Sequence, residues 1–346
     1  MLKSEKTTEF NYGLALLRML MCFEVVLCHC WMEKDFPKIL LPFDILRNNA
    51  VPVFMFMSFY LSRKYFLKKN IKSAARRAYV LFVPQVFWAI IYFVIYFLIE
   101  LIVNHRYIVK IQDLFWQIFT GHSPNLNATM WFQTDLLIIS VLFFVVFYFL
   151  SEKQGVFTII LLSVICLFLQ YSRMNYELFG QLRYELKFPL GRLAETFPIA
   201  TFGFISSKYN LLSLLKKRWI NISIATVLFV LSFVLSHQKH LLIIDNDFGY
   251  SGIWKIITGY AITMFAYNCN FSLSEKKSKF IAFISQNTLG VYCSHRLIAF
   301  FLFNVFQIID IQTGKFYQCV LVYLIGFVVF TIIKKFVPYK WINYII

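Results

Sequence analysis

An arginine and a histidine lie within the first apolar stretch of the chain, Tyr12 to Trp31. Arg18 and His29 are eleven positions apart, so a helix at 100° per residue returns both side chains to nearly one face, roughly 16 Å apart along the axis. Imidazole suits proton transfer near neutral pH, whereas a guanidinium binds an anion or stabilises developing negative charge. Because ionisable groups within a membrane span are costly and rarely face lipid, this pair predicts a reaction centre or a pathway.

A second interpretation of the same helix needs no chemistry. Arg18 can extend its charged end to the inner interface, while His29 and Trp31 form the outer aromatic belt. Glu24 lies on the same helix, roughly 120° from the face of the pair. Its carboxyl group must therefore meet a neighbouring helix or be protonated. The spacing alone leaves both interpretations open.

Two more clusters of polar residues occur in later apolar stretches. Arg192 and Glu195 are three positions apart and can pair on a helix surface. They form either a structural pair or part of an acceptor site in which Glu195 binds sugar hydroxyls. Near the outer end of another stretch, Asp135 stands beside Trp131, where a loop lysine can pair with it.

A polar string enters the apolar stretch that begins near residue 281. Within it, Tyr292 and His295 share a helix face, and Thr288 precedes Tyr292 by one turn. Such a stripe inside a membrane helix faces either a cavity or a partner helix.

Basic residues are concentrated between Arg63 and Tyr79. This segment holds seven of them, including Lys72, Arg76 and Arg77, directly before an aromatic stretch. The cluster suits a polyphosphorylated ligand or anionic lipid headgroups, or it simply marks the cytoplasmic side.

The elements that position these residues are predicted to be membrane-spanning helices. Hydrophobic residues make up 60% of the 346 residues and charged ones only 15%, and continuous apolar runs recur at lengths near the roughly 20 residues of a spanning helix. We therefore predict an all-α polytopic membrane bundle of about ten transmembrane helices, forming a single domain over residues 1–346. The ten predicted spans are residues 12–32, 49–67, 80–103, 131–150, 156–171, 191–206, 218–236, 250–269, 281–307 and 316–336.

The distribution of basic residues orients this bundle. With the N-terminus inside, 20 lysines and arginines fall in cytoplasmic segments and 11 in outer segments, which predicts that both termini are cytoplasmic. The net charge of +17 is then mostly a topology signal and requires no nucleic-acid partner. The longer outer segments, residues 104–130, 172–190 and 237–249, are expected to face the acceptor.

The cysteine pattern gives no sign of a metal site. The seven cysteines are odd in number and nearly all fall in or beside the predicted spans, which favours packing over a disulfide framework. Cys28, His29 and Cys30 are consecutive and point in different directions on a helix, so they do not have metal-ligand spacing. The sequence also has no Gly-rich phosphate loop and no nucleophile elbow.

In order along the chain, these clusters resemble those of integral membrane acyltransferase family 3. The matching segments are the Arg18 to His29 spacing, the aromatic run Val51 to Ser58, the basic stretch through Arg77 with the Pro84 helix, Trp131-Phe132 followed by Leu136, the Phe202-Gly203-Phe204 turn, and Thr288 to His295. One position departs from the pattern. Where the family has Gly after the serine, this chain has Phe59, which fills a site of close helix approach.

The resemblance implies an O-acyltransferase of the bacterial cytoplasmic membrane. It implies an acyl-CoA donor, most often acetyl-CoA, no metal, and a hydroxyl of a surface or exported glycan as acceptor. His29 would act as general base or transient acyl acceptor, with Arg18 as its electrostatic partner in the donor path. CoA phosphates would lie on Lys72, Arg76 and Arg77. Five residues are assigned to the substrate cavity and acceptor site: Trp131, Arg192, Glu195, Tyr292 and His295.

Two rival functions use the same features. A transporter or flippase for a glycan or a lipid-linked intermediate also explains ten helices with internal polar stripes. A structural partner in polysaccharide export is a third possibility. The absence of inverted repeats and of helix pairs broken by Gly or Pro favours the enzyme. Proteins of polysaccharide synthesis or export are expected as its partners.

Overall fold

The computed structural model describes most of the chain, and the described part is predominantly helical. The described residues are 10–30, 48–104, 108–123, 125–126, 130–174, 190–237, 252–270, 274–308 and 315–337. Within these ranges the chain forms twelve α-helices and no strand. The prediction of an all-α bundle is therefore confirmed.

The helices match the predicted spans closely. Their bounds are α1 Tyr12–Cys30, α3 Ala50–Leu67, α4 Ile71–Ile99, α5 Ile111–Thr120, α6 Trp131–Phe149, α7 Glu152–Met174, α10 Leu190–Lys208, α11 Arg218–His237, α12 Ile253–Asn268, α13 Glu275–Ser285, α14 Thr288–Ile308 and α15 Lys315–Phe336. Each of the ten predicted spans overlaps at least one of these helices, because a continuous apolar run satisfies its backbone hydrogen bonds in lipid only as a helix. The helices α5 and α13 were not predicted as separate elements.

Six helices in the described part of the chain are long and apolar enough to cross a membrane. These are α1, α4, α6, α7, α14 and α15. The other four predicted spans correspond to α3, α10, α11 and α12, which are shorter or more polar. Three of these four contact the long helices directly: α3 packs on α1 and α6, α10 on α6 and α7, and α12 on α1. The fourth, α11, packs on α12. A polytopic membrane protein follows from these lengths and compositions.

Two boundaries differ from the prediction for local reasons. The helix α4 begins at Ile71, well before the predicted start, since the Asn70 side chain accepts hydrogen bonds from the backbone N–H groups of Lys72 and Ser73 and caps the helix. The basic segment is thus mostly helix rather than loop. The ninth predicted span divides at Gln286 and Asn287 into α13 and α14.

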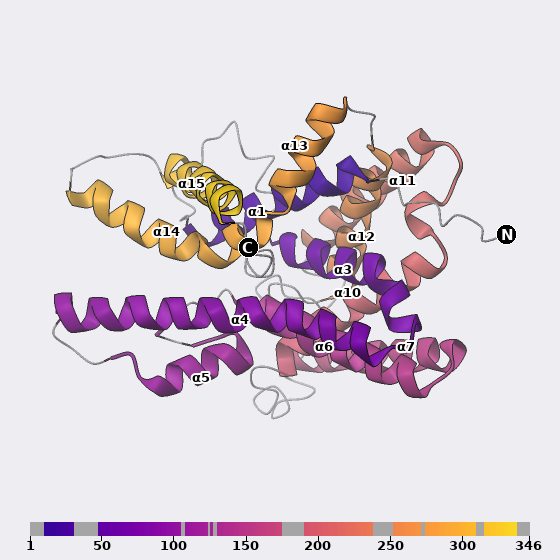
Figure 1. Ribbon diagram of the computed structural model, residues 1–346. Helices are drawn as coiled ribbons and strands as arrows, with labels where there is room; N and C mark the ends of the chain where they lie inside the picture. The colour runs from indigo at the N-terminus through magenta and orange to yellow at the C-terminus, as the bar shows by residue number, and fades with distance from the viewer. Residues whose placement is uncertain are drawn as a thin grey trace.

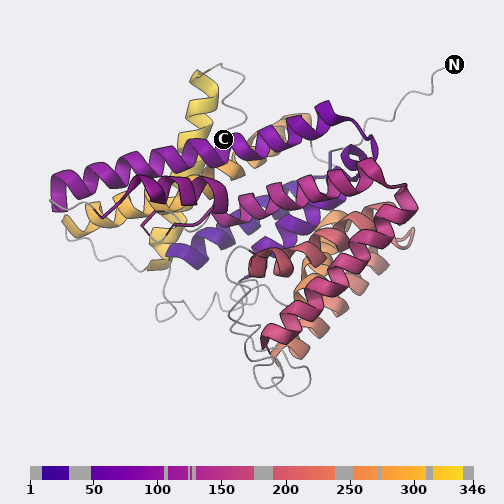
Figure 2. The ribbon, with the colours of Figure 1, turned by 90° about the horizontal axis from the view of Figure 1, so that it is seen from below.

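The first helix lies between two groups of helices. In Figure 1, α4 runs across the molecule with α5 beneath it and α14 and α15 on the same side, while α11 and α12 lie at the other end. Figure 2 shows that α7, α11 and α12 are inclined to α4. The helix α1 contacts α12 and α3 as well as α13, α14 and α15. Its side chains therefore reach both groups.

The close approach of helices occurs at Gly203 rather than at the family's glycine position. A Cβ atom at Gly203 on α10 would clash with the backbone oxygen of Phe56 on α3. Phe59 is fully buried, its ring stacked on Phe66 at 5.6 Å between centroids and 4.7 Å from the ring of Phe143. The ring that replaces the family's glycine thus joins an aromatic core between α3 and α6.

The short helix α5 has the reverse of the usual amphipathic pattern. Its polar residues Asp113 and Gln117 are buried, and the Gln117 carbonyl accepts a hydrogen bond from Gln85 of α4 at 2.8 Å. Its large apolar residues Phe115 and Phe119 are exposed. The predicted outer segment 104–130 therefore contains a helix that packs its polar side on the bundle. Most of the other two predicted outer segments lies outside the described residues.

Candidate functional site

Arg18 lines a cavity in the bundle. The cavity has a volume of about 260 Å³ and lies between α1, α3, α4, α6 and α14. Its polar lining comes from Arg18, Ser58, Gln133, Thr288 and Tyr292, and the rest is apolar. Within the described residues the Arg18 guanidinium makes no hydrogen bond or ion pair, so its charge is available to an anion in this cavity, which we call the Arg18 cavity.

His29 meets a second histidine rather than the arginine. The rings of His29 on α1 and His295 on α14 lie 5.4 Å apart between centroids. His295 is fully buried, and its Nδ1 lies 2.6 Å from the carbonyl oxygen of Tyr292. Because a carbonyl only accepts, Nδ1 carries the hydrogen and Nε2 presents a lone pair. This Nε2 atom is buried without a hydrogen-bond partner among the described residues, whereas His29 is exposed.

Tyr292 connects the cavity with the two histidines. Its side chain lines the Arg18 cavity, and its ring centroid lies 6.2 Å from that of His295. Neither His29 nor His295 lines the cavity itself. Contacts thus lead from the Arg18 cavity through Tyr292 to His295 and then to His29. The two histidines lie at the end of this series that is farther from Arg18.

The Glu24 side chain is hydrogen-bonded to the start of another helix. Its buried carboxylate accepts hydrogen bonds from the backbone N–H groups of Asn48 and Ala50, the latter at 2.9 Å, and from the Cys28 thiol. These amides are at the start of α3, where a negative charge is favoured. Glu24 thus meets a neighbouring helix, as one interpretation of the sequence required, and fixes α1 against α3.

Arg77 points into the bundle and is held by neutral groups. Its guanidinium donates to the hydroxyls of Ser58, Ser62 and Ser140 at 3.0, 2.6 and 3.1 Å. It also lies over the ring of Phe66 at 5.5 Å. No carboxylate among the described residues pairs with it. Since Ser58 also lines the Arg18 cavity, Arg77 adds positive charge directly behind the cavity wall.

The other two predicted phosphate ligands lie apart from Arg77. Lys72 and Arg76 are one helical turn apart on α4 and both are exposed. Of the three predicted ligands of the CoA phosphates, two are therefore exposed and one, Arg77, faces into the bundle.

The predicted acceptor residues come together with a carboxylate from another helix. Arg192 on α10 lies 3.5 Å from the carboxylate of Asp135 on α6, donates to the carbonyl of Thr120 at 3.0 Å, and lies over the ring of Trp131 at 5.0 Å. Asp135 is fully buried, and its partner is this arginine rather than a loop lysine. Glu195, also buried, lies on the same helix as Arg192.

This acceptor cluster of Trp131, Asp135, Arg192 and Glu195 adjoins the histidine side of the site. Tyr292 lies within electrostatic range of Arg192, and its ring is 6.1 Å from Phe132, the neighbour of Trp131 in sequence. The same tyrosine therefore borders the Arg18 cavity, the two histidines and the acceptor cluster.

Several residues of the site were missed or misassigned from sequence. Ser62 and Ser140 hold Arg77, but an isolated serine in an apolar helix gives no signal of its role. Asp135 did carry a signal, because a carboxylate within a membrane span is expected to face a polar partner inside the bundle.

Among the described residues, no group of three or more His, Cys, Asp or Glu side chains is arranged to hold a metal ion. The polar residues of the site come from six helices of one membrane bundle: α1, α3, α4, α6, α10 and α14. The fold and the site define a polytopic membrane protein with an internal polar centre.

The comparison with family models identifies the family. The model described as an acyltransferase domain matches residues 11–334, nearly the whole chain. The chain belongs to integral membrane acyltransferase family 3, and the resemblance inferred from its motifs is confirmed. Comparisons with curated proteins and with solved structures gave no match.

Proposed function

We propose that this acyltransferase takes an acyl group, most often acetyl, from cytoplasmic acyl-CoA and transfers it to a hydroxyl of a surface or exported glycan. We place it in the cytoplasmic membrane of a bacterium. One observation carries the proposal: Tyr292 joins a cavity lined by the Arg18 guanidinium, which has no partner among the described residues, to the contact between His29 and His295. An acyl group that crosses the membrane needs such a path from a donor site to a reactive group.

The donor side is supported by its positive charge. Arg18 lines the cavity, and Arg77 stands behind its Ser58 wall, where its hydrogen bonds to the described residues all go to serine hydroxyls. Arginines bind phosphate strongly through paired hydrogen bonds. In our proposal the exposed Lys72 and Arg76 bind the outer phosphates of CoA, and the thioester end enters the cavity.

The transfer step belongs to His29 and has two versions. As a transient acyl acceptor, the imidazole nitrogen attacks the thioester carbon, the C–N bond forms and the C–S bond breaks. The remaining ring N–H proton passes to the thiolate, so CoA leaves as its thiol. The acceptor hydroxyl oxygen then attacks the same carbon, the C–N bond breaks and the hydroxyl proton goes to the imidazole. As a general base, His29 takes the hydroxyl proton while the oxygen attacks the thioester carbon directly. The C–O bond forms, the C–S bond breaks, and the proton passes from His29 to the departing CoA thiolate. In our proposal His295, with a lone pair on Nε2, assists His29 as a neighbouring proton acceptor.

The acceptor cluster fits a polyhydroxyl substrate. Carboxylates accept hydrogen bonds from hydroxyl groups, and Asp135 and Glu195 supply two of them beside the ring of Trp131. We propose that a sugar of the glycan lies here, delivered by the proteins that synthesise or export the polymer.

The test uses the purified protein in liposomes with acetyl-CoA labelled in the acetyl group. We expect release of CoA, and label on a candidate glycan when one is added. His29→Ala should abolish both while the protein still inserts in the membrane, and Lys153→Gln, at an exposed lysine on α7, serves as a control for expression and insertion. Label retained on His29 without acceptor selects the transient acyl version, and no label selects the general-base version.

Unchanged glycan acylation in His29→Ala would contradict the catalytic role of this residue. If no acyl-CoA yields free CoA, the enzyme proposal fails and transport of a glycan or lipid-linked intermediate becomes the better explanation.

A further inference from the structure

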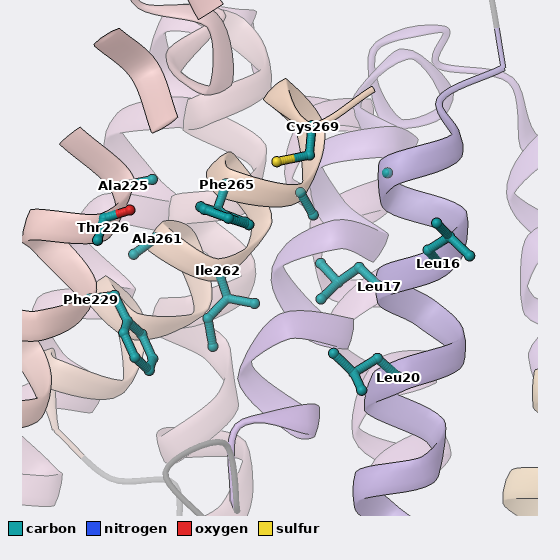
Figure 3. Close-up of a pocket in the computed structure, with 12 residues that line it drawn as sticks. Leu16, Leu17, Leu20, Ala225, Thr226, Phe229, Ala261, Ile262, Phe265 and Cys269 are labelled. Atoms are coloured by element: carbon teal, nitrogen blue, oxygen red, sulfur yellow. The ribbon is translucent and has the colours of Figure 1, made fainter. Parts of the chain in front are cut away.

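A second cavity lies on the opposite side of α1 from the Arg18 cavity. It has a volume of about 480 Å³ and lies between α1, α11 and α12 (Figure 3), within the range of roughly 300–1,000 Å³ in which ligand pockets fall. Leu17 lines this cavity, and the next residue, Arg18, lines the other. The first helix is therefore the wall between them, and we call the second one the apolar cavity.

The lining of the apolar cavity is hydrocarbon almost throughout. Leu20, Phe229 and Ile262 project toward it in Figure 3. The hydroxyl of Thr226 at its edge donates to the carbonyl of Ile222 in its own helix at 2.9 Å. It has no other donor to offer a polar ligand, since a hydroxyl carries one hydrogen. An occupant of this cavity must therefore be an apolar chain.

Small residues make room for such a chain. Ala225 on α11 and Ala261 on α12 are buried and line the cavity. At the end that Cys269 also lines, the cavity is closed, because α1 and α12 touch so tightly at Gly13 that an added Cβ would clash with the carbonyl of Ala266. A void of this size lined almost entirely by apolar side chains does not hold stable water.

The cavity is open toward the outside of the bundle. Leu16, Leu20 and Phe265 line it and are 36%, 37% and 45% exposed. The helix α1 is long and apolar enough to span the membrane, and on α11 the exposed side carries Val230 and Leu231. In a bilayer this opening faces lipid chains and excludes water.

Basic side chains lie at the end of the apolar cavity that Cys269 lines. Arg218, the first residue of α11, donates through Nη1 to the carbonyl of Asn270 at 3.0 Å, one residue beyond Cys269. The preceding residues Lys216 and Lys217 are exposed. These ends of α11 and α12 are on the cytoplasmic side in the predicted orientation, and a basic cluster beside an apolar chain site suits the phosphate of an anionic lipid.

The same end is fixed to α1. The backbone N–H of Tyr12 donates to Oδ1 of Asn270 at 2.9 Å, and the Asn11 side chain donates to the carbonyl of Tyr267 at 3.1 Å. Asn270 thus links the start of α1 to Arg218 of α11. A lipid held at this point contacts all three helices at once.

We propose that the apolar cavity binds one acyl chain of an anionic phospholipid from the cytoplasmic leaflet, with the lipid phosphate on Arg218 and its neighbouring lysines. The lipid fills the space between α1 and the α11–α12 pair. It supports the wall that carries Arg18, independently of which donor or acceptor the enzyme uses.

The first test measures lipid retention by native mass spectrometry of the purified protein in detergent, with equal amounts of dioleoylphosphatidylglycerol or dioleoylphosphatidylcholine added. We expect one phosphatidylglycerol molecule to be retained in preference to phosphatidylcholine. Arg218→Gln should weaken its binding about fivefold, the contribution of one basic residue near a lipid surface. Lys153→Gln, at an exposed lysine on another helix, should leave it unchanged. Equal retention of the two lipids would overturn the proposal.

The second test fills the cavity. Thr226→Trp places an indole at the cavity edge and should remove the bound phosphatidylglycerol. The matched control is Thr158→Trp on α7, since the Thr158 hydroxyl also bonds its own helix, to the Gln154 carbonyl. A lipid adduct that persists in Thr226→Trp at wild-type strength would contradict the site.

A third measurement uses the unaltered chain and so avoids any effect of substitution on folding. Phosphatidylglycerol with a photoreactive diazirine in its acyl chain is incorporated into liposomes with the protein and irradiated. The label should map to the cavity-lining segments of α1, α11 and α12, around residues 16–20, 225–229 and 261–269. Label confined to other helices would refute the assignment.

Discussion

Two inward-facing arginines of this protein are held in opposite ways. Arg77 on α4 is bound by three serine hydroxyls and lies over Phe66. Arg192 on α10 is 3.5 Å from the fully buried carboxylate of Asp135 and lies over Trp131. Both arginines rest on an aromatic ring, but within the described part of the chain Arg192 has a counter-charge and Arg77 has none.

The difference indicates what each arginine can bind. Hydroxyls satisfy the hydrogen-bonding groups of Arg77 without cancelling its charge, so the charge still attracts an anion. In the Arg192 pair the two charges offset each other, and the carboxylate oxygens remain as acceptors for hydroxyl groups. This contrast fits an anionic donor near Arg77 and a neutral, hydroxyl-rich acceptor near Arg192.

The largest expected effect is on folding, in Arg192→Met. The substitution leaves Asp135 as an unpaired buried charge, so we expect the free energy of unfolding to fall by about 3–5 kcal/mol. Chemical unfolding in detergent micelles measures this loss. Adding Asp135→Leu in the same chain should restore most of the stability, because no buried charge remains. If Arg192→Met costs no more than Arg77→Met, the proposed contrast between the two sites is wrong.

A smaller loss of stability but a specific loss of donor binding is expected in Arg77→Met. The three serines lose a partner, at a cost of about 1–3 kcal/mol for unsatisfied buried hydroxyls. The affinity for acyl-CoA should fall roughly tenfold or more, the value of one charged hydrogen bond. Titration with acyl-CoA by calorimetry measures the affinity, and Lys153→Met provides a control that removes an exposed cation elsewhere. Unchanged acyl-CoA affinity in Arg77→Met would show that Arg77 does not take part in donor binding.

The helices could be predicted far better than the contacts between them. Apolar runs of near-spanning length directly determine helices in lipid, which is why the ten predicted spans overlap helices of the structure. The early start of α4 was missed because it depends on a single capping side chain, Asn70. The split between α13 and α14 lies in the polar string, which the apolar pattern alone assigns to one span.

In the site, too, positions on one helix could be predicted but contacts between helices could not. The positions of Arg18 and His29 on one helix follow from helical periodicity, and their separation excludes a direct hydrogen bond. The partner of His29 is His295, more than 260 residues away along the chain, and the partner of Arg192 is Asp135 on another helix. Periodicity within one helix cannot predict which helices are neighbours, and so it could not identify either pair.

An intermediate effect is expected in Ser58→Ala, which tests the link between Arg77 and the Arg18 cavity. Arg77 keeps Ser62 and Ser140 as partners, so the loss of one hydrogen bond should lower the free energy of unfolding by about 1 kcal/mol. The matched control is Ser73→Ala on α4, a partly exposed serine, which should cost less. Equal losses in thermal unfolding experiments would show that Ser58 contributes little to holding Arg77.

The smallest expected effect is a pH dependence at His122, beside the Arg192 site. Burial and the positive charge of Arg192 lower the pKa of His122 below its usual value. Above the unfolded pKa of about 6.5 the residue is neutral in both states, and its full contribution to stability is present. As the pH falls below that value the unfolded state binds the proton first, so this contribution is progressively lost. Because His122 is only partly buried, the loss should be smaller than that of Ser58→Ala.

The measurement that isolates this contribution is the difference in melting temperature between the wild type and His122→Gln, followed from pH 8 to about pH 5.5. Glutamine does not titrate in this range, so the wild type should lose more stability than the variant as the pH falls. Adding Arg192→Met with Asp135→Leu removes the charge that opposes protonation, and the pH-dependent difference should then decrease. A difference that stays the same in the chain carrying both substitutions would mean that burial alone keeps His122 neutral, and that the Asp135 carboxylate already cancels the charge of Arg192 at the distance of His122.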